Sequence, residues 1–186
     1  MLLFCSIFVF GQENEFSLIE IDSTWGQEVL RFPARNMNYE GVGEVRFPPE
    51  GWRDVNHKNF WTYTYAWEIN LDRIITAKEV AENLEKYFNS LNRIEMDATI
   101  DTRFASASVH KISSKNSTTY FKGSVKTYDR FATNKNITLH VLVESFLCEK
   151  EKKTIILFKF SPKEFEHEVW QTTLKGISLY TNLCKD

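Results

Sequence analysis

The sequence predicts an α+β fold, with a single antiparallel sheet of about six to seven strands and two packed helices near residues 76–92 and 162–176. Several segments alternate large apolar or β-branched residues with polar ones, which is the pattern of a strand with two different faces. Two other stretches begin with a capping motif and continue with apolar residues at helical spacing. This order of elements predicts helices packed on at least one face of the sheet.

Short strands are expected in the first third of the chain, at 18–21, 28–32 and 43–47, because proline, asparagine and glycine residues separate them. A stronger strand follows at 60–69. Its odd-numbered positions carry large side chains, whereas threonine, alanine and glutamate lie between them, so one face is predicted to be strongly aromatic. The aromatic row consists of Trp61, Tyr63, Tyr65 and Trp67.

The first helix is predicted near 76–92. Thr76 and Glu79 match the capping box, in which the threonine hydroxyl accepts from the Glu79 amide and the glutamate reaches back to the Thr76 amide. Apolar residues then recur at helical spacing and define a buried stripe. They are Val80, Leu84, Phe88 and Leu91.

Four further strands are predicted in meander order, and their short polar connections make neighbours antiparallel. They cover 99–111, 119–131, 136–147 and 153–160. A second capping motif at 161–164, with proline in the first turn, predicts the last helix near 162–176. The buried stripe of this helix would be Phe165, Val169, Trp170, Leu174 and Ile177.

Residues 1–11 form an uncharged, almost wholly apolar block with the length of a signal-peptide core, much shorter than the roughly 20 residues of a membrane-spanning helix. No Lys or Arg precedes this block, so the predicted signal peptide is truncated at its N-terminus. The alternative is a buried N-terminal strand. We expect an exported protein, periplasmic or secreted, whose residues 12–186 form one α+β domain without a transmembrane segment.

Removal of residues 1–11 would take away Cys5 and leave Cys148 and Cys184, an even number in a compartment that permits disulfides. The strand 153–160 would lead roughly 25 Å away from Cys148 at about 3.3 Å per residue. The helix near 162–176 would return roughly 21 Å at about 1.5 Å per residue. A Cys148–Cys184 disulfide is therefore predicted, and two free buried thiols are the alternative.

The charge and the motifs exclude several functions. The formal net charge of −2 provides no basic excess for nucleic acid or for an anionic membrane surface. No nucleophile elbow, Walker loop, zinc-protease motif or Cys-x-x-Cys pair occurs. We expect no cofactor, no bound metal and no nucleic-acid partner, and catalysis is the less favoured interpretation.

One constellation could support chemistry. If the turn at 133–135 pairs Phe131 with Asn136, His140 lies opposite Thr127, and Asp129, His140 and Glu144 share one apolar face of the sheet. A histidine beside carboxylates in an apolar setting could serve as a general base, which would make the protein a hydrolase. A one-residue slip in register would separate these side chains. Structural hydrogen bonding is the more common role of such residues.

The aromatic row allows two interpretations. Trp61, Tyr63, Tyr65 and Trp67 could stack on a sugar or an apolar ligand, which would indicate a lipid or sugar carrier. Such a row more often forms the core beneath a helix. The favoured function is an exported, non-catalytic binding or accessory domain whose partner is a protein or a small apolar ligand.

The layout also resembles the PsbP-like α/β/α sandwich family. The segment Phe47-Pro48-Pro49-Glu50-Gly51-Trp52 is similar to the strand and "P-x-G-W" segment near the N-terminus of that family. The strand 60–69, the helix led by Ala77 and Val80, and the closing helix with Trp170 and Leu174 follow the family order, over roughly residues 17–183. The family shares no catalytic residues, so the resemblance implies an accessory or protein-interaction role.

Overall fold

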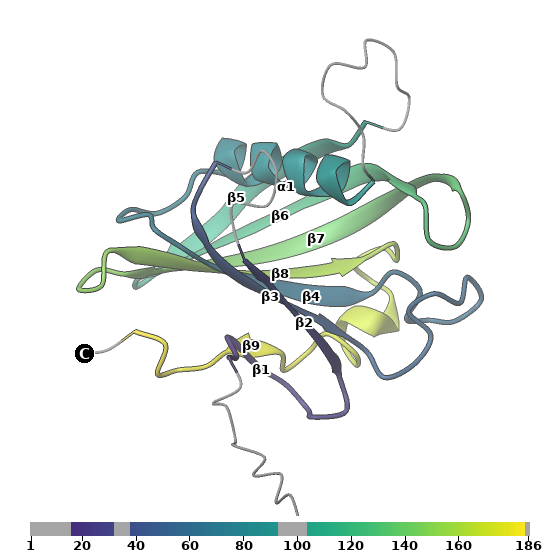
Figure 1. Cartoon of the computed structure of the whole chain (residues 1–186), viewed down its shortest axis with the longest axis horizontal. Coiled ribbons are helices and arrows are strands. Elements are labelled where there is room, and N and C mark those ends of the chain that lie inside the picture. The colour runs from purple at the N-terminus through teal and green to yellow at the C-terminus, as the bar shows by residue number, and fades with distance from the viewer. Residues whose placement is uncertain (1–15, 32–37, 93–103, 185–186) are drawn as a thin grey trace, which may run out of the picture.

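The computed structural model describes residues 16–31, 38–92 and 104–184, so the predicted signal peptide at 1–11 lies outside the described residues. Within them the chain forms a seven-stranded antiparallel sheet in the order β2-β3-β4-β8-β7-β6-β5 (Figure 1). The strands are β2 (Gly26–Arg31), β3 (Gly41–Phe47), β4 (Tyr63–Ile69), β5 (Ser106–Lys115), β6 (Thr118–Asp129), β7 (Lys135–Cys148) and β8 (Lys153–Ser161).

The predicted fold class is wrong, because the protein is mostly β and its described residues hold a single α-helix, α1 (Ala77–Leu91). The second packed helix, expected near 162–176, is absent. That segment folds into turns and the short 3-10 helix η1 (Glu168–Trp170). The apolar residues of the expected stripe still face the sheet, and four of them are buried. These four are Val169, Trp170, Leu174 and Ile177.

Local contacts explain why helical spacing does not produce a helix at 162–176. The indole N–H of Trp170 donates to the carbonyl oxygen of Lys163 at 2.9 Å, and the His167 side chain caps η1 by accepting from the Val169 amide at 3.2 Å. Gly176 then takes a φ of +83°, which ends a helical path. Burial against the sheet is the main source of stability for such a segment, and here turns achieve that burial without a helix.

The helix predicted from the capping box is confirmed and is present as α1. The hydroxyl of Thr76 accepts from the Glu79 amide at 3.3 Å, and the Glu79 carboxylate accepts from the Thr76 amide at 2.9 Å. Val80, Leu84 and Phe88 are fully buried against the sheet. Figure 1 shows α1 lying across one face of the sheet, which we call the front face.

The opposite, back face is covered by the two ends of the described chain rather than by a helix. Residues 16–21 and 162–184 lie against it and pair through a two-stranded sheet, β1 (Ile19–Glu20) with β9 (Ser178–Leu179). Their apolar side chains pack on Ala66 and Leu157 of the large sheet. The molecule therefore has three layers, namely a helix, a sheet and an irregular back cover (Figure 1).

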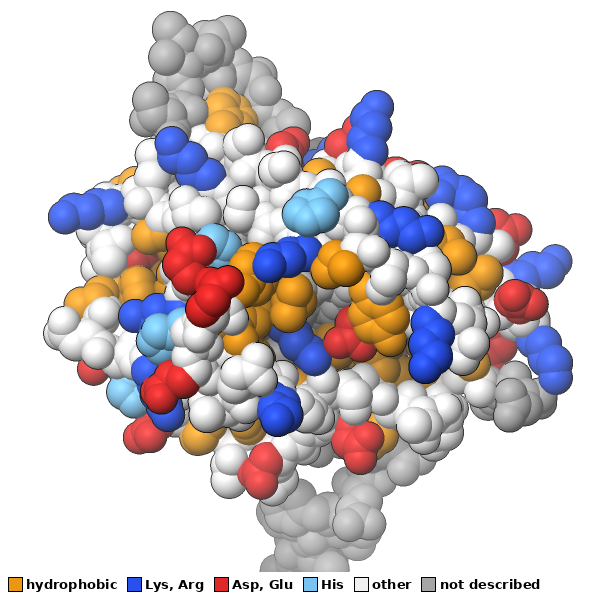
Figure 2. Space-filling view, turned by 180° about the vertical axis from the view of Figure 1, so that it is seen from behind, with side chains coloured by type: hydrophobic (Ala, Val, Ile, Leu, Met, Phe, Trp, Pro, Cys, Tyr) orange, Lys and Arg blue, Asp and Glu red, His pale blue; other side chains and the backbone are white. Residues whose placement is uncertain are grey.

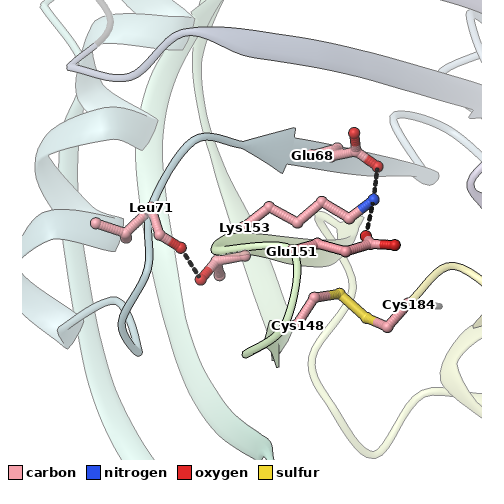
Figure 3. The surroundings of a disulfide bond; sticks show 7 residues. Glu68, Leu71, Cys148, Glu151, Lys153 and Cys184 are labelled. Carbon is pink, nitrogen blue, oxygen red and sulfur yellow. Dashed lines mark hydrogen bonds and ion pairs between the residues drawn. A yellow bond between two sulfur atoms is a disulfide. The ribbon is translucent and has the colours of Figure 1, made fainter. Parts of the chain in front are cut away.

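A disulfide joins Cys148 to Cys184, as predicted, with 5.4 Å between their Cα atoms (Figure 3). It ties the end of the back cover to the end of β7. Beside it Lys153 forms ion pairs with Glu68, at 3.1 Å, and with Glu151. Burial disfavours the charged ammonium, but the hydrogen bonds to Glu151 and Glu68 outweigh it and raise the pKa of Lys153. Turns, not the expected helix, bring Cys184 back to this place.

Candidate functional site

An aromatic cleft of about 350 Å³ opens on the front face, beside the C-terminal part of α1. Four separate parts of the chain line it, namely the strands β2 to β4, the connection 48–62, the helix α1 and the turn 130–134 between β6 and β7. Six of its lining side chains are aromatic. They are Phe47, Trp52, Trp61, Tyr63, Tyr87 and Phe131.

The connection 48–62 is held in a fixed shape by successive turn hydrogen bonds. The Asp54 amide donates to the Gly51 carbonyl at 3.2 Å, and the His57 amide donates to the Asp54 carbonyl at 3.0 Å. The Trp61 amide then closes the connection on the Trp52 carbonyl at 3.0 Å. Gly51 has a φ of +79°, and a Cβ there would collide with the His57 ring, so glycine is required. The closure brings Trp52 and Trp61 side by side.

The rings around the cleft contact one another at aromatic distances. The Trp52 ring lies 4.9 Å from Phe47 and 5.6 Å from Trp61, measured between centroids. Phe131 lies 5.8 Å from both tryptophans and is 38% exposed, which makes it the most exposed of these rings. A ligand entering the cleft would therefore meet aromatic surface on several sides.

Asp129 organises the turn that carries Phe131. One oxygen of its carboxylate accepts from the amides of Phe131, at 2.9 Å, and Ala132, at 3.1 Å. The other oxygen accepts from the amide of Thr133 at 2.8 Å and from its hydroxyl at 2.7 Å. Burial disfavours the carboxylate, but these hydrogen bonds outweigh it and lower the pKa of Asp129. Asp129 thus stays ionised and has a structural role at the cleft.

Few polar groups reach the cleft. The guanidinium of Arg53 lies 5.1 Å from the centre of the Trp52 ring, and Glu28 lines the wall formed by β2. Burial, followed by the neighbouring Tyr87, raises the pKa of Tyr63 well above its usual value. Burial likewise raises the pKa of Tyr87. Both hydroxyls therefore stay protonated at physiological pH, and the charges of the cleft come from Arg53 and Glu28.

The structure divides the predicted aromatic row between the cleft and the core. Trp61 and Tyr63 line the cleft. Tyr65 and Trp67 lie deeper, where Tyr65 contacts Tyr87 of α1 at 5.0 Å and Trp67 contacts the ring of Phe158 at 4.8 Å. Only the first half of the row is therefore placed to contact a ligand.

The predicted pairing of β6 with β7 is wrong, and the constellation of Asp129, His140 and Glu144 is not formed. Asp129, and not Phe131, is the last paired residue of β6, and it lies opposite Lys135. The turn is thus longer than expected, and the register differs by an odd number of positions. Because side chains alternate between faces, Asp129 faces the front, whereas His140 and Glu144 face the back.

His140 and Glu144 each have a partner on the back face. The His140 imidazole lies 3.3 Å from the Glu164 carboxylate and 5.1 Å from the Phe165 ring, both of which belong to the back cover. Glu144 binds Lys159 of β8 at 3.1 Å. The His140 contacts attach the cover to the sheet, whereas the Glu144–Lys159 pair lies within the sheet, and neither residue forms a catalytic group with Asp129.

A second cleft, of about 290 Å³, lies on the back between the sheet and the C-terminal segment. Tyr120, Glu144, Phe146 and Leu183 contribute to its lining. Figure 2 views the molecule from the side opposite to Figure 1, with the front and back faces of the sheet still above and below, and hydrophobic side chains gather there around a hollow among charged ones. We regard the front cleft as the better candidate, because six aromatic rings line it and because the walls of the back cleft include the chain's own C-terminal residues.

Sequence reasoning missed Trp52, Arg53 and Phe131 as residues of the site. All three lie in connections, and no local pattern brings the connection 48–62 against the turn 130–134. The "P-x-G-W" segment contains Trp52, but it was informative only for a family resemblance. No family model, curated protein or solved structure matches this chain, so the PsbP-like resemblance stays a prediction.

Proposed function

We propose that this protein is a non-catalytic binding or accessory domain that takes a small apolar ligand into the aromatic cleft. The observation that carries the proposal is the meeting of six aromatic side chains, from four parts of the chain, around one opening of about 350 Å³. Ligand sites are typically apolar concavities of about 300–1,000 Å³ with a few polar groups. An open concavity lined by aromatic rings exposes apolar surface that a ligand could cover.

A lipid or sugar carrier is a second form of the same proposal. Trp61 and Tyr63, from the predicted aromatic row, are placed on the cleft wall with Trp52 beside them. Indole rings stack on alkyl chains and on the apolar faces of sugars. A hydrolase centred on His140 is not proposed, because Asp129 lies on the other face of the sheet.

We further propose that the protein works after export, in the periplasm or outside the cell. The Cys148–Cys184 disulfide supports this, because such bonds persist in oxidising compartments. The apolar block at residues 1–11 supports it as well. Among the described residues, no helix is long and apolar enough to cross a membrane.

The neutral probe N-phenyl-1-naphthylamine, which fluoresces when it leaves water, tests the cleft directly. We expect the purified protein to enhance its fluorescence in a saturable manner. Phe131→Ala should weaken the binding by about tenfold, because it removes a large ring from one side of the cleft. Phe131 is 38% exposed, so the variant should still fold, which far-UV circular dichroism would check.

Val55→Ala is the matched control for Phe131→Ala. Val55 is 48% exposed, lies in the connection 48–62 and does not line the cleft. We expect its probe affinity to equal that of the unmodified protein. Equal losses in both variants, or no saturable enhancement at all, would contradict binding in the aromatic cleft.

A further inference from the structure

We propose that the ligand of the aromatic cleft carries a carboxylate on its apolar body, and that Arg53 and the Trp52 indole bind this carboxylate. The inference rests on the proposed function and adds the chemical class of the ligand. It follows from an imbalance of hydrogen-bond donors and acceptors on one side of the cleft.

One buried donor at the cleft lacks an acceptor. The indole N–H of Trp52 is buried and has no hydrogen-bond partner among the described residues, whereas the Tyr63 hydroxyl interacts with Tyr87. Buried polar groups are almost always paired, because leaving one unpaired is costly. Trp52 is one of the side chains that line the cleft. An oxygen-bearing ligand would supply the missing acceptor.

Arg53 adds an uncompensated positive charge on the same side. Its guanidinium lies 5.1 Å from the Trp52 ring centre and 6.0 Å from that of Phe131. Two other arginines of the described chain, Arg46 and Arg73, each bind a glutamate. Arg53 is exposed, has no carboxylate partner among the described residues, and has its guanidinium over two rings. A guanidinium without a carboxylate partner is well suited to bind a planar carboxylate of a ligand.

Glu28 defines how such a ligand would be oriented. It lies on β2, opposite Val45 of β3, whereas Arg53 belongs to the connection 48–62. A carboxylate is repelled by Glu28 and attracted by Arg53, so the charged end should lie at the Trp52 side and the apolar body should extend toward Val45 and Tyr87. A cationic ligand would have the opposite preference, which makes it the informative competitor.

Three probes of nearly equal shape test the inference, namely 2-naphthoate, 2-naphthalenemethanol and 2-naphthylmethylammonium. Their affinities for the full protein would be measured by isothermal titration calorimetry at low salt. We expect 2-naphthoate to bind about tenfold or more tightly than the alcohol, because a hydrogen bond between two charged groups is stronger than one to a neutral hydroxyl. The ammonium should bind more weakly than the alcohol.

Substitutions then assign the preference to Arg53. Arg53→Gln should remove most of the advantage of 2-naphthoate over the alcohol and leave the affinity for the alcohol within about twofold. Arg130→Gln is the matched control, because Arg130 lies 5.8 Å from the same Phe131 ring but does not line the cleft. It should retain the advantage. Glu28→Gln should strengthen the binding of 2-naphthoate.

The outcomes separate the two proposals. If the alcohol or the ammonium binds as tightly as 2-naphthoate, or if Arg53→Gln and Arg130→Gln have equal effects, the carboxylate inference is wrong while the apolar cleft still stands. If none of the three probes binds up to its solubility limit, the cleft is not a ligand site and both proposals are overturned.

Discussion

The front and back faces of the sheet are covered in different ways. The front is covered by α1, and its contacts are large rings such as those of Tyr65, Trp67 and Phe158. The back is covered by irregular chain whose buried apolar cluster is smaller. Apolar packing is spread over many side chains, so the front cover does not depend on any single contact.

The back cover is instead fastened at a few points. One is the disulfide at Cys184. Another is Glu44 of β3, which is fully buried and accepts from the Ile19 amide at 3.2 Å and from the Gln27 side chain at 3.0 Å. Its carboxylate also binds the Arg46 guanidinium. The comparison shows that a face without a regular element can be held by polar and covalent anchors, and each of them should be individually important.

The largest effect is expected from Glu44→Ala. The substitution leaves the Arg46 guanidinium, which is only 12% exposed, without its carboxylate, and removes the acceptor for the Ile19 amide. Breaking a buried ion pair from one side costs about 3–5 kcal/mol. Urea denaturation should show this loss in the free energy of unfolding.

Hydrogen exchange would show where the effect of Glu44→Ala is felt. Amides of residues 16–21 should lose protection first, whereas those of α1 should keep theirs until global unfolding. Glu79→Ala, which removes a carboxylate from the front cover, is the matched control. Uniform loss of protection over both faces would contradict the idea of a separately anchored back cover.

The next largest effect is expected when both Cys148 and Cys184 are replaced by serine. The bond closes a loop with a sequence separation of 36 residues, and its loss should destabilise the protein by about 2–4 kcal/mol. The measurement is the midpoint of urea unfolding with and without dithiothreitol. The reductant should shift the midpoint of the unmodified protein and leave that of the double variant unchanged. The ligand binding that we propose for the front cleft should persist, because the disulfide lies on the other face.

Features that depend on neighbouring residues could be predicted from the sequence, whereas features that depend on the shape of a turn or on distant residues could not. The capping box of Thr76 and Glu79 involves neighbours along the chain, so α1 and its start could be read directly. The pairing of Asp129 with Lys135 depends on the shape of a turn in which Asn134 has a φ of +54°, and no alternation pattern determines that shape. A small error in turn length was enough to move His140 to the wrong face.

The last helix and the cleft could not be predicted for a related reason. Apolar residues between Phe165 and Ile177 recur at helical spacing, yet their burial against the sheet is achieved by turns. The cleft joins Trp52 to Phe131 over a long separation in sequence, and only the folded chain brings them together. The Cys148–Cys184 pair was predictable from the count of cysteines, although the helix that was expected to bring Cys184 back is replaced by turns.

The smallest effect is expected at Glu79, a partly solvated polar anchor at the start of α1, which also bonds to β5 and β6 through other polar side chains such as Glu85 and Asn92. The Glu79 carboxylate binds the Arg73 guanidinium and accepts from the Tyr39 hydroxyl at 2.8 Å and from the Thr76 amide at 2.9 Å. The hydrogen bond from Arg73, followed by those from Thr76 and Tyr39, outweighs partial burial and lowers the pKa of Glu79 far below the usual 4.5. The site is partly solvated, so Glu79→Gln should cost only about 1 kcal/mol at pH 7.

The sign of the pH dependence distinguishes this anchor from simple packing. Because the pKa of Glu79 is lowered in the folded state, its contribution is fully present above pH 4.5 and is lost as the pH falls below that value. The difference in unfolding free energy between the unmodified protein and Glu79→Gln should therefore shrink progressively in urea titrations carried out between pH 5 and about pH 2.5. Val80→Ala, which removes apolar packing from the same turn of α1, should show a larger difference that stays constant over this range. If the Glu79→Gln difference were equally constant, the carboxylate would stabilise α1 through its shape and not through its charge.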